Sequence, residues 1–195
     1  NPDSELEKNT LEKFLQTAND IRDFAIIGPA IQDEKNLQNN SKLLKEVDTV
    51  KGFAMFLNLE QFKDIGFFDD NFFIYLEEID LCKRLKDKNK KIFVDPKILV
   101  HHQGGVSHDA KYNFEMELSR NWHWMWSNFY FTKKHKGFLY ALLYVSDKLI
   151  SGLIKYVFYS LIAKNSKKQI YRQRISGLFN SITGKSSWYR PFNNN

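Results

Sequence analysis

The first part of the chain alternates between apolar residues at helical spacing and short apolar runs typical of strands. Residues 4–19 carry apolar positions at helical spacing, with Ser4 as a candidate N-cap. Residues 24–29 predict a short buried strand that stops at a Gly-Pro pair. Residues 47–57 predict a second strand, interrupted at Gly52, where a backbone can approach a ligand closely.

The same alternation continues in the next part of the chain. A short helix is predicted over residues 59–65, followed by an aromatic and acidic loop over residues 67–75. Residues 76–87 predict a longer helix, and two short strands, 91–94 and 97–101, flank an Asp-Pro pair. Because helices and strands alternate, we expect an α/β fold here.

The pattern changes at Tyr112, after which no strand signal remains. Three helices are predicted, over residues 114–136, 138–163 and 167–182. We therefore expect two domains, an α/β domain over residues 1–111 and a helical tail over residues 112–195.

Composition narrows the class of protein. The chain has 195 residues, of which 15% are aromatic, and a single cysteine. One cysteine excludes a disulfide framework or a cysteine-rich zinc module and suits a reducing compartment. The chain shows no basic-then-apolar leader, so no signal peptide is visible in it. Because it begins without Met and within a motif, we expect it to be a piece of a longer protein.

Charge divides the chain as sharply as hydrophobicity does. Residues 1–132 carry 17 Lys and Arg against 22 Asp and Glu, whereas residues 133–195 carry 12 against one. The apolar helix over residues 138–163 is long enough to span a bilayer, but Asp147, Lys148 and Lys155 would make a crossing costly. We expect this helix to lie on an anionic membrane surface; a cap folded onto the α/β domain is the alternative.

The densest group of acids lies at the start of the helix over residues 76–87. Glu77, Glu78 and Asp80 fall within one turn, with Arg84 one turn further on. Mutual repulsion raises the pKa of at least one clustered carboxyl, as a general base near neutral pH requires. Acids also favour helix N-termini for electrostatic reasons alone, but the surrounding aromatic residues favour a functional site.

A second polar group, residues 101–108, contains three histidines and follows an apolar strand. Imidazole and carboxylate ligands both suit manganese-type ions, so one of these histidines and a distant Asp predict a divalent-metal site. An ordinary turn with surface histidines is the alternative.

Taken in order, these segments resemble the C-terminal half of a family-2 inverting glycosyltransferase of the bacterial rhamnosyltransferase-like type. The matching segments are Asn-Pro-Asp at 1–3, Ile-Gly-Pro at 27–29, Val-Lys-Gly-Phe-Ala-Met at 50–55, the aromatic loop at 66–73, Tyr-Leu-Glu-Glu-Ile-Asp-Leu-Cys-Lys-Arg at 75–84, Pro96, and His-Gln-Gly-Gly-Val-Ser at 102–107. The resemblance implies the C-terminal part of a GT-A fold, followed here by an α-helical, membrane-associating tail. It also implies transfer of a sugar from a nucleoside-diphosphate donor with inversion at the anomeric carbon.

The resemblance also implies roles for residues near the reacting groups. Asp3 and His102 would bind a divalent metal, Mn or Mg, on the diphosphate of the donor. Glu78 occupies the position of the general base, where the family more often has Asp, so the choice between Glu77 and Glu78 stays open. Asp80 completes the acidic motif as the third candidate catalytic residue.

Substrate contacts are implied for residues on both sides of the acidic motif. Gly52 and Met55 would line the sugar pocket, and three aromatic residues would form the acceptor side: Phe72, Phe73 and Tyr75. Arg84 is expected to pair with Glu77 or Asp80 and so hold the helix beside the substrate. The family's N-terminal nucleotide-binding half has no counterpart in the chain, which predicts that the chain alone does not turn over donor.

The sequence thus predicts an enzyme of surface-polysaccharide synthesis at the cytoplasmic face of the bacterial inner membrane, attached peripherally. Its partners would be a nucleoside-diphosphate sugar, a glycan or lipid-linked acceptor, and the anionic membrane surface, with no nucleic acid. The resemblance alone suggests rhamnose as the transferred sugar. One alternative is a catalytically inactive, membrane-bound assembly partner of such enzymes. A second alternative is a nucleic-acid-binding protein that uses the basic, aromatic tail.

Overall fold

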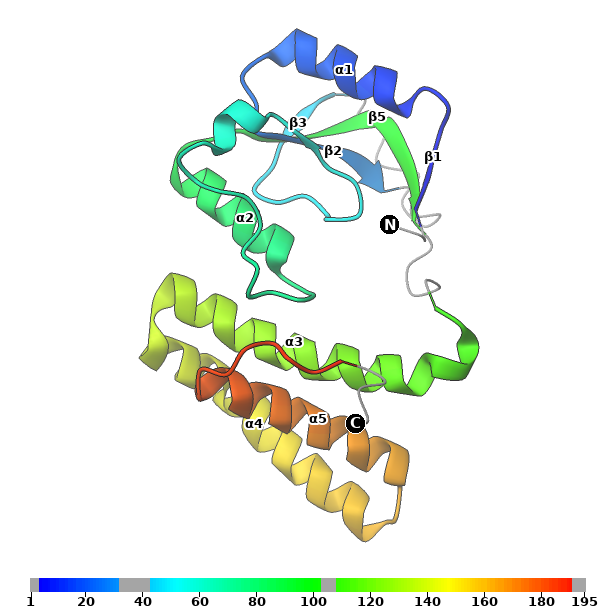
Figure 1. The fold of residues 1–195 in the computed structure, drawn as a ribbon, viewed down its shortest axis with the longest axis vertical. Helices are drawn as coiled ribbons and strands as arrows, with labels where there is room; N and C mark the ends of the chain where they lie inside the picture. The colour runs from blue at the N-terminus through cyan, green and yellow to red at the C-terminus, as the bar shows by residue number, and fades with distance from the viewer. Residues whose placement is uncertain (1–3, 32–42, 103–107, 191–195) are drawn as a thin grey trace. The chain divides into compact units, whose positions relative to one another are not determined.

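The computed structural model describes residues 4–31, 43–102 and 108–190. The chain forms two compact units, each described by itself below (Figure 1). The mixed unit comprises Asn1–Asp69 and Glu78–His108, and the helical unit comprises Asp70–Glu77 and Asp109–Asn195. Residues 70–77, which the sequence analysis assigned to the α/β domain, therefore belong with the helices.

The mixed unit is built on a five-stranded sheet. Its strands are β1 (Ser4–Leu6), β2 (Ile26–Ile31), β3 (Lys45–Glu46), β4 (Phe56–Leu57) and β5 (Ile92–His102). The strand order is β1-β5-β2-β4, with β3 also paired to β5. Among the described strands, β2 and β5 run parallel and the other pairs are antiparallel.

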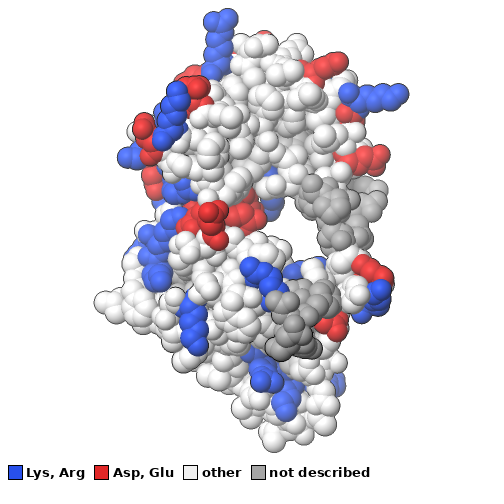
Figure 2. All heavy atoms as spheres, in the orientation of Figure 1, with Lys and Arg blue, Asp and Glu red and all other residues white. Residues whose placement is uncertain are grey.

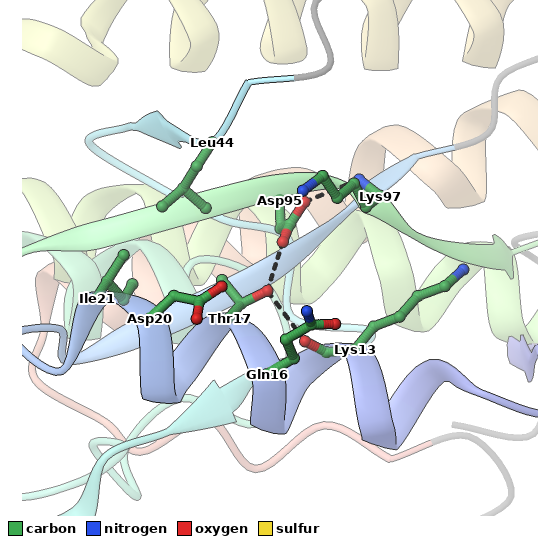
Figure 3. Close-up of a pocket in the computed structure, with 8 residues that line it drawn as sticks. All are labelled: Lys13, Gln16, Thr17, Asp20, Ile21, Leu44, Asp95 and Lys97. Atoms are coloured by element: carbon green, nitrogen blue, oxygen red, sulfur yellow. Dashed lines mark hydrogen bonds between the residues drawn. The ribbon is translucent and has the colours of Figure 1, made fainter.

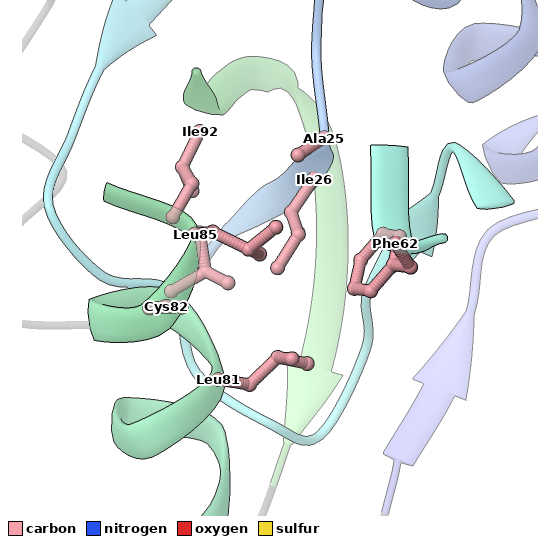
Figure 4. Packing of buried hydrophobic residues seen from close by; sticks show 8 residues of the cluster. Ala25, Ile26, Phe62, Leu81, Cys82, Leu85 and Ile92 are labelled. Atoms are coloured by element: carbon pink, nitrogen blue, oxygen red, sulfur yellow. The ribbon is translucent and has the colours of Figure 1, made fainter. Parts of the chain in front are cut away.

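Helices cover both faces of this sheet because neighbouring residues of a strand point to opposite sides. On one face, Ile27 and Ile98 pack with Phe14 of α1 (Thr10–Ile21). On the other, Ile26 and Ile92 belong to a cluster completed by α2 (Glu77–Asp87) and the 3-10 helix Leu59–Phe62. Figure 4 shows this second cluster, in which Leu81, Cys82 and Leu85 of α2 face the strands.

Two of the predicted strands prove to be one. β5 runs from Ile92 to His102, and its register against β2 shifts where Pro29 pairs with Asp95 and Ala30 with Leu99. The carboxylate of Asp95 accepts the Lys97 N–H at 2.8 Å and the Thr17 hydroxyl at 2.5 Å (Figure 3). These bonds hold the bulge, so the strand continues past Pro96, which has no N–H to give to the sheet.

Three other expectations for the mixed unit hold only in part. Ser4 does not cap a helix, because residues 4–6 pair with β5 and α1 begins only at Thr10. The predicted strand over residues 47–57 is confined to β4 at its end. The predicted helix over residues 59–65 is a single 3-10 turn.

The helical unit contains three long helices, α3 (Asn113–Lys136), α4 (Phe138–Leu161) and α5 (Asn165–Ile182), preceded by a 3-10 turn at Ala110–Tyr112. Met125 and Phe129 of α3 pack against Ala141 and Val145 of α4 and against Leu178 of α5. Within the described residues, no helix combines the length and hydropathy needed to cross a membrane.

Close approach of α3 and α5 depends on one glycine. A methyl group at Gly177 would lie 2.2 Å from the carbonyl oxygen of Trp122, a distance that no side chain tolerates. Gly137, with φ of 87°, makes the turn between α3 and α4 in a left-handed conformation that favours glycine.

Candidate functional site

The first turn of α2 carries the acidic motif and lies against Gly52. A methyl group at position 52 would lie 3.3 Å from Cβ and 3.5 Å from Cγ of Glu78. The loop that contains Gly52 therefore approaches the Glu78 side chain closely. Oε2 of Glu78 is buried and has no hydrogen-bond partner among the described residues. A buried carboxylate oxygen without a partner calls for a functional explanation.

Asp80 is arranged differently from Glu78, although both lie in the same turn. Its side chain is fully buried and accepts a hydrogen bond from Nε of Arg84 at 2.8 Å. A buried carboxylate that is paired with a guanidinium suits a structural anchor. Of the two partners expected for Arg84, the structure thus shows Asp80.

Arg84 also ties α2 to the loop that follows the 3-10 helix. Its guanidinium donates to the carbonyl oxygens of Ile65, at 2.8 Å, and of Phe67. One arginine thereby fixes both the buried acid of the motif and the backbone of the aromatic loop. Its contacts are to protein groups, so we assign it a positioning role.

The aromatic segment Asp70–Glu77 packs on α3. The buried ring of Phe72 meets Trp126 and Tyr130 edge to face, with centroids 6.5 and 5.0 Å apart. The Ser127 hydroxyl donates to the carbonyl oxygen of Ile74 at 2.9 Å. Phe72 is thus part of a core cluster, whereas the ring of Phe73 is half exposed.

The segment ends in an unusual backbone turn. Tyr75 and Leu76 both have φ of 70°, a left-handed conformation that is rare for side chains of this size. Consecutive residues of this kind persist only where the surroundings fix them, and they concentrate at functional sites. The turn directly precedes Glu77, the first residue of α2.

His123 anchors the same segment from α3 and was not identified from the sequence. The imidazole is fully buried, and its Nε2 donates to the carbonyl oxygen of Tyr189 at 2.7 Å. Burial lowers the pKa of His123 to about 4, so the ring is neutral at neutral pH. The centroid of the Phe73 ring is 4.9 Å from that of the His123 ring and 3.5 Å from Cζ of Arg190.

A signal for these anchors exists in the sequence. His123 and Ser127 lie four residues apart within a tryptophan-rich helix, so they share one face of it. Polar residues on an otherwise aromatic face indicate buried hydrogen bonds. What they bond to, Tyr189 and Ile74, is distant in sequence and could not be read from spacing.

Of the two predicted metal ligands, only the backbone of His102, at the end of β5, is among the described residues. Ser4 is the Cα partner of His102 in the antiparallel pairing of β1 with β5. Asp3 and the side chain of His102 are outside the described residues. Within the residues that are described, no group of three or more His, Cys, Asp or Glu side chains is arranged to hold a metal ion.

Two further residues of the mixed unit, Met55 and Cys82, pack in or against its hydrophobic core. Met55 packs against the core cluster that contains Ile26 and Leu81. Cys82 is fully buried in that cluster, and burial raises the pKa of its thiol, which disfavours the nucleophilic thiolate.

A small pocket in the mixed unit carries no candidate chemistry. It has a volume of about 100 Å³ and is lined by α1, β5 and Leu44 (Figure 3). This is below the size of most ligand pockets, and its buried acid, Asp95, is already hydrogen-bonded to Thr17 and Lys97.

The chain is similar to one characterised class of enzyme. It is 26% identical over 178 residues to the low-salt glycan biosynthesis hexosyltransferase Agl10 of Haloferax volcanii, an alignment that covers 78% of this chain. The chain spans 56% of the length of that protein. No family model matches the chain, and no solved structure matches it. The similarity supports a glycosyltransferase role in general.

Proposed function

We propose that this chain is part of an inverting glycosyltransferase that moves a sugar from a nucleoside diphosphate to a glycan or lipid-linked glycan. The observation that carries the proposal is Glu78, whose carboxylate has a buried oxygen without a hydrogen-bond partner among the described residues and packs against Gly52. The similarity to a glycan biosynthesis hexosyltransferase supports the class of reaction.

In this mechanism Glu78 is the general base. Its carboxylate takes the proton of the acceptor hydroxyl as the hydroxyl oxygen attacks the anomeric carbon of the donor. The bond from that carbon to the diphosphate oxygen breaks, and the nucleoside diphosphate departs with the electron pair. Attack opposite to the leaving group inverts the anomeric configuration, with no covalent enzyme intermediate.

Neighbouring residues support Glu78 without taking its proton. Arg84 is bonded to Asp80 and to backbone carbonyls, so it holds α2 and the loop before it in place. Gly52 leaves room beside the Glu78 side chain. The left-handed turn at Tyr75 and Leu76 orients the chain as it enters α2.

A divalent ion fits the chemistry of Asp3 and His102. The pairing of Ser4 with His102 joins the strand that follows Asp3 to the strand that ends in His102. Carboxylate and imidazole together suit Mn²⁺ and, with water ligands, Mg²⁺. When bound, such an ion would supply positive charge for the departing diphosphate.

We further propose peripheral attachment to the cytoplasmic face of a membrane through α4. Its exposed apolar residues include Leu139, Leu143, Ile150, Leu153, Ile154, Val157, Phe158 and Leu161. Lys164, Lys167, Lys168 and Arg172 follow at the start of α5, and Figure 2 shows Lys and Arg side chains spread over the helical unit. An apolar face bordered by basic residues suits an anionic bilayer surface.

The test of the enzymatic proposal is release of nucleoside diphosphate by the complete protein. We would compare Glu78→Gln with wild type across a panel of nucleotide sugars, with Mn²⁺ or Mg²⁺ and a lipid-linked acceptor. Loss of the base should lower kcat by about 10²- to 10⁴-fold. Glu60→Gln, which changes an exposed Glu of the 3-10 helix, is the matched control and should keep wild-type activity.

Other outcomes would count against the proposal in different ways. Full activity of Glu78→Gln with loss in Glu77→Gln would keep the reaction and move the base by one residue. No release from any donor by a folded protein would overturn the enzymatic function and favour an inactive assembly partner.

A further inference from the structure

A shallow cleft of about 370 Å³ in the helical unit has the composition of a binding site. It is lined by Tyr75, Arg120, Asn121, Trp124 and Arg174. Two arginines, one amide and two aromatic side chains meet here, and none of the described residues that line the cleft is acidic. The cleft is therefore electropositive and suits an anionic ligand.

The two arginines are prepared for a ligand in different ways. Arg174 is fixed by its hydrogen bond to Oδ1 of Asn121, at 3.1 Å, and by contact with the sulfur of Met125, at 3.7 Å. Arg120 is half-buried, and among the described residues no hydrogen bond or ion pair engages its guanidinium. Each guanidinium presents its donors in a planar fork, a geometry that matches a phosphate group.

The aromatic side of the cleft adds a second kind of recognition. The rings of Trp124 and Tyr75 meet edge to face, with centroids 5.4 Å apart, and Trp124 remains 40% exposed. Burial raises the pKa of Tyr75, so its phenol keeps a proton to donate at neutral pH. An exposed indole and a phenol donor suit the apolar face and the hydroxyls of a sugar ring.

We infer that this cleft binds the phosphate and first sugar of a phosphate-linked glycan acceptor. The assignment of this ligand as the acceptor rests on the proposed function. The preference for a phosphate and a sugar is argued from the residues that line the cleft. Tyr75 lies three residues before the proposed base, Glu78, and three residues span at most about 11 Å. Along the chain, the segment that lines the cleft is therefore next to the residue that must take the acceptor's proton, and this closeness in sequence favours the acceptor as the ligand.

Binding is tested without turnover, through tryptophan fluorescence of the complete protein. The probes are a sugar 1-phosphate, the same free sugar and inorganic pyrophosphate. We expect the sugar 1-phosphate to bind most tightly and Arg120→Gln to weaken it by about tenfold or more, the usual effect of losing a charged hydrogen bond. Lys63→Gln, which removes an exposed charge of the mixed unit, should bind as wild type does.

A second variant guards against loss of folding. Arg120→Lys keeps the charge but loses the planar fork, so it should fold and bind the sugar 1-phosphate with intermediate affinity. Equal affinities of wild type and both Arg120 variants for the sugar 1-phosphate would overturn the site. Binding of pyrophosphate and sugar 1-phosphate with equal affinity would overturn the role of the aromatic side.

Kinetics separate the two sources of such a phosphate. If the cleft serves the acceptor, Arg120→Gln should raise KM for a lipid-diphosphate-linked glycan about tenfold and leave KM for the nucleotide sugar unchanged. A raised KM for the nucleotide sugar alone would mean that the donor's diphosphate binds here, which would overturn the acceptor assignment. Because the fluorescence assay needs no catalysis, the site stands or falls separately from the proposed reaction.

Discussion

Gly52 and Glu78 approach so closely that a methyl group on residue 52 would lie 3.3 Å from Cβ of Glu78. This distance is tighter than ordinary van der Waals contact, so the side chain of residue 78 must move if residue 52 gains one. The two residues come from a loop and a helix that are far apart in sequence. Their contact links the backbone around residue 52 to the position of the proposed base.

Gly52→Ala should therefore impair catalysis more than folding. We expect kcat to fall by about three- to tenfold, because a small displacement of the base weakens proton transfer. The free energy of unfolding should change by less than about 1 kcal/mol, since Gly52 is exposed and lacks a left-handed φ. Lys51→Ala is the neighbouring control, and an unaltered kcat in Gly52→Ala would disconnect residue 52 from the base.

The pair of Asp80 and Arg84 should matter for stability. Replacing Arg84 by Met removes the guanidinium from a fully buried carboxylate, and we expect a loss of about 3 kcal/mol in the free energy of unfolding. Lys83→Met breaks an exposed pair with Asp87 in the same helix and should cost less than about 0.5 kcal/mol.

Cys82 offers a probe of this effect that reports on the mixed unit alone. It is the sole cysteine of the chain and is buried in the core of that unit, whereas every Trp and Tyr lies in the helical unit. Thiol reactivity at increasing urea concentration therefore follows unfolding of the mixed unit. If Arg84→Met protects Cys82 as well as wild type does, the ion pair does not stabilise this unit.

The sequence was most informative where structure depends on local periodicity. The three long helices after Tyr112 match their predicted ranges closely because many residues contribute to a 3.6-residue pattern. The strands were harder to predict: Ser4 joins a strand only because β5 lies beside it, and β5 passes Pro96 only because Thr17 and Lys97 bond to Asp95. Apart from Lys97, these partners are distant in sequence and leave no local signal.

The candidate site divides in the same way. The acidic motif could be found because its members are adjacent along the chain. Their different roles could not be predicted, because Arg84 shares a helix face with Asp80, one turn away, and with Glu77, two turns away, and only packing selects Asp80. The cleft around Trp124 could not be predicted, because its lining residues come from the segment at Tyr75, from α3 and from α5, which are far apart in sequence.

His123 predicts a pH dependence for the helical unit. Its pKa is lowered from 6.5 to about 4 by burial, so between these values the unfolded chain binds a proton that the folded unit does not. Stability of the helical unit should therefore fall as pH decreases from 6.5 towards 4, and should be independent of His123 above that window. Protonation would also place a charge beside the backbone contact with Tyr189.

This dependence can be measured by urea unfolding followed through tryptophan fluorescence, because all four Trp lie in the helical unit. The urea midpoint of wild type should be lower at pH 4.5 than at pH 7. His123→Gln should flatten the difference, whereas His135→Gln should leave it. An equal change in urea midpoint between pH 7 and pH 4.5 for wild type and His123→Gln would show that His123 does not titrate in this window.

Metal dependence offers a test of Asp3 and His102. Removal of divalent ions by a chelator should abolish release of nucleoside diphosphate, and added Mn²⁺ should restore it in wild type. Asp3→Asn and His102→Gln should each need more Mn²⁺ to reach half of their maximal rate, by about tenfold or more. Asp109→Asn, an exposed acid near the start of the helical unit, is the control. Activity that survives the chelator would remove the metal from the proposal.

The outer face of α4 should govern attachment to lipid. Ile154 and Val157 are more than half exposed, so Ile154→Glu with Val157→Glu adds charge to that face without burying it in the core. We expect wild type to co-sediment with vesicles rich in anionic lipid more than with zwitterionic ones, and the double variant to lose most of this binding. Leu11→Glu, at an equally exposed position of α1, is the matched control. Undiminished sedimentation of the double variant would exclude this face, and a change in oligomeric state without lipid binding would assign it to a second copy of the chain.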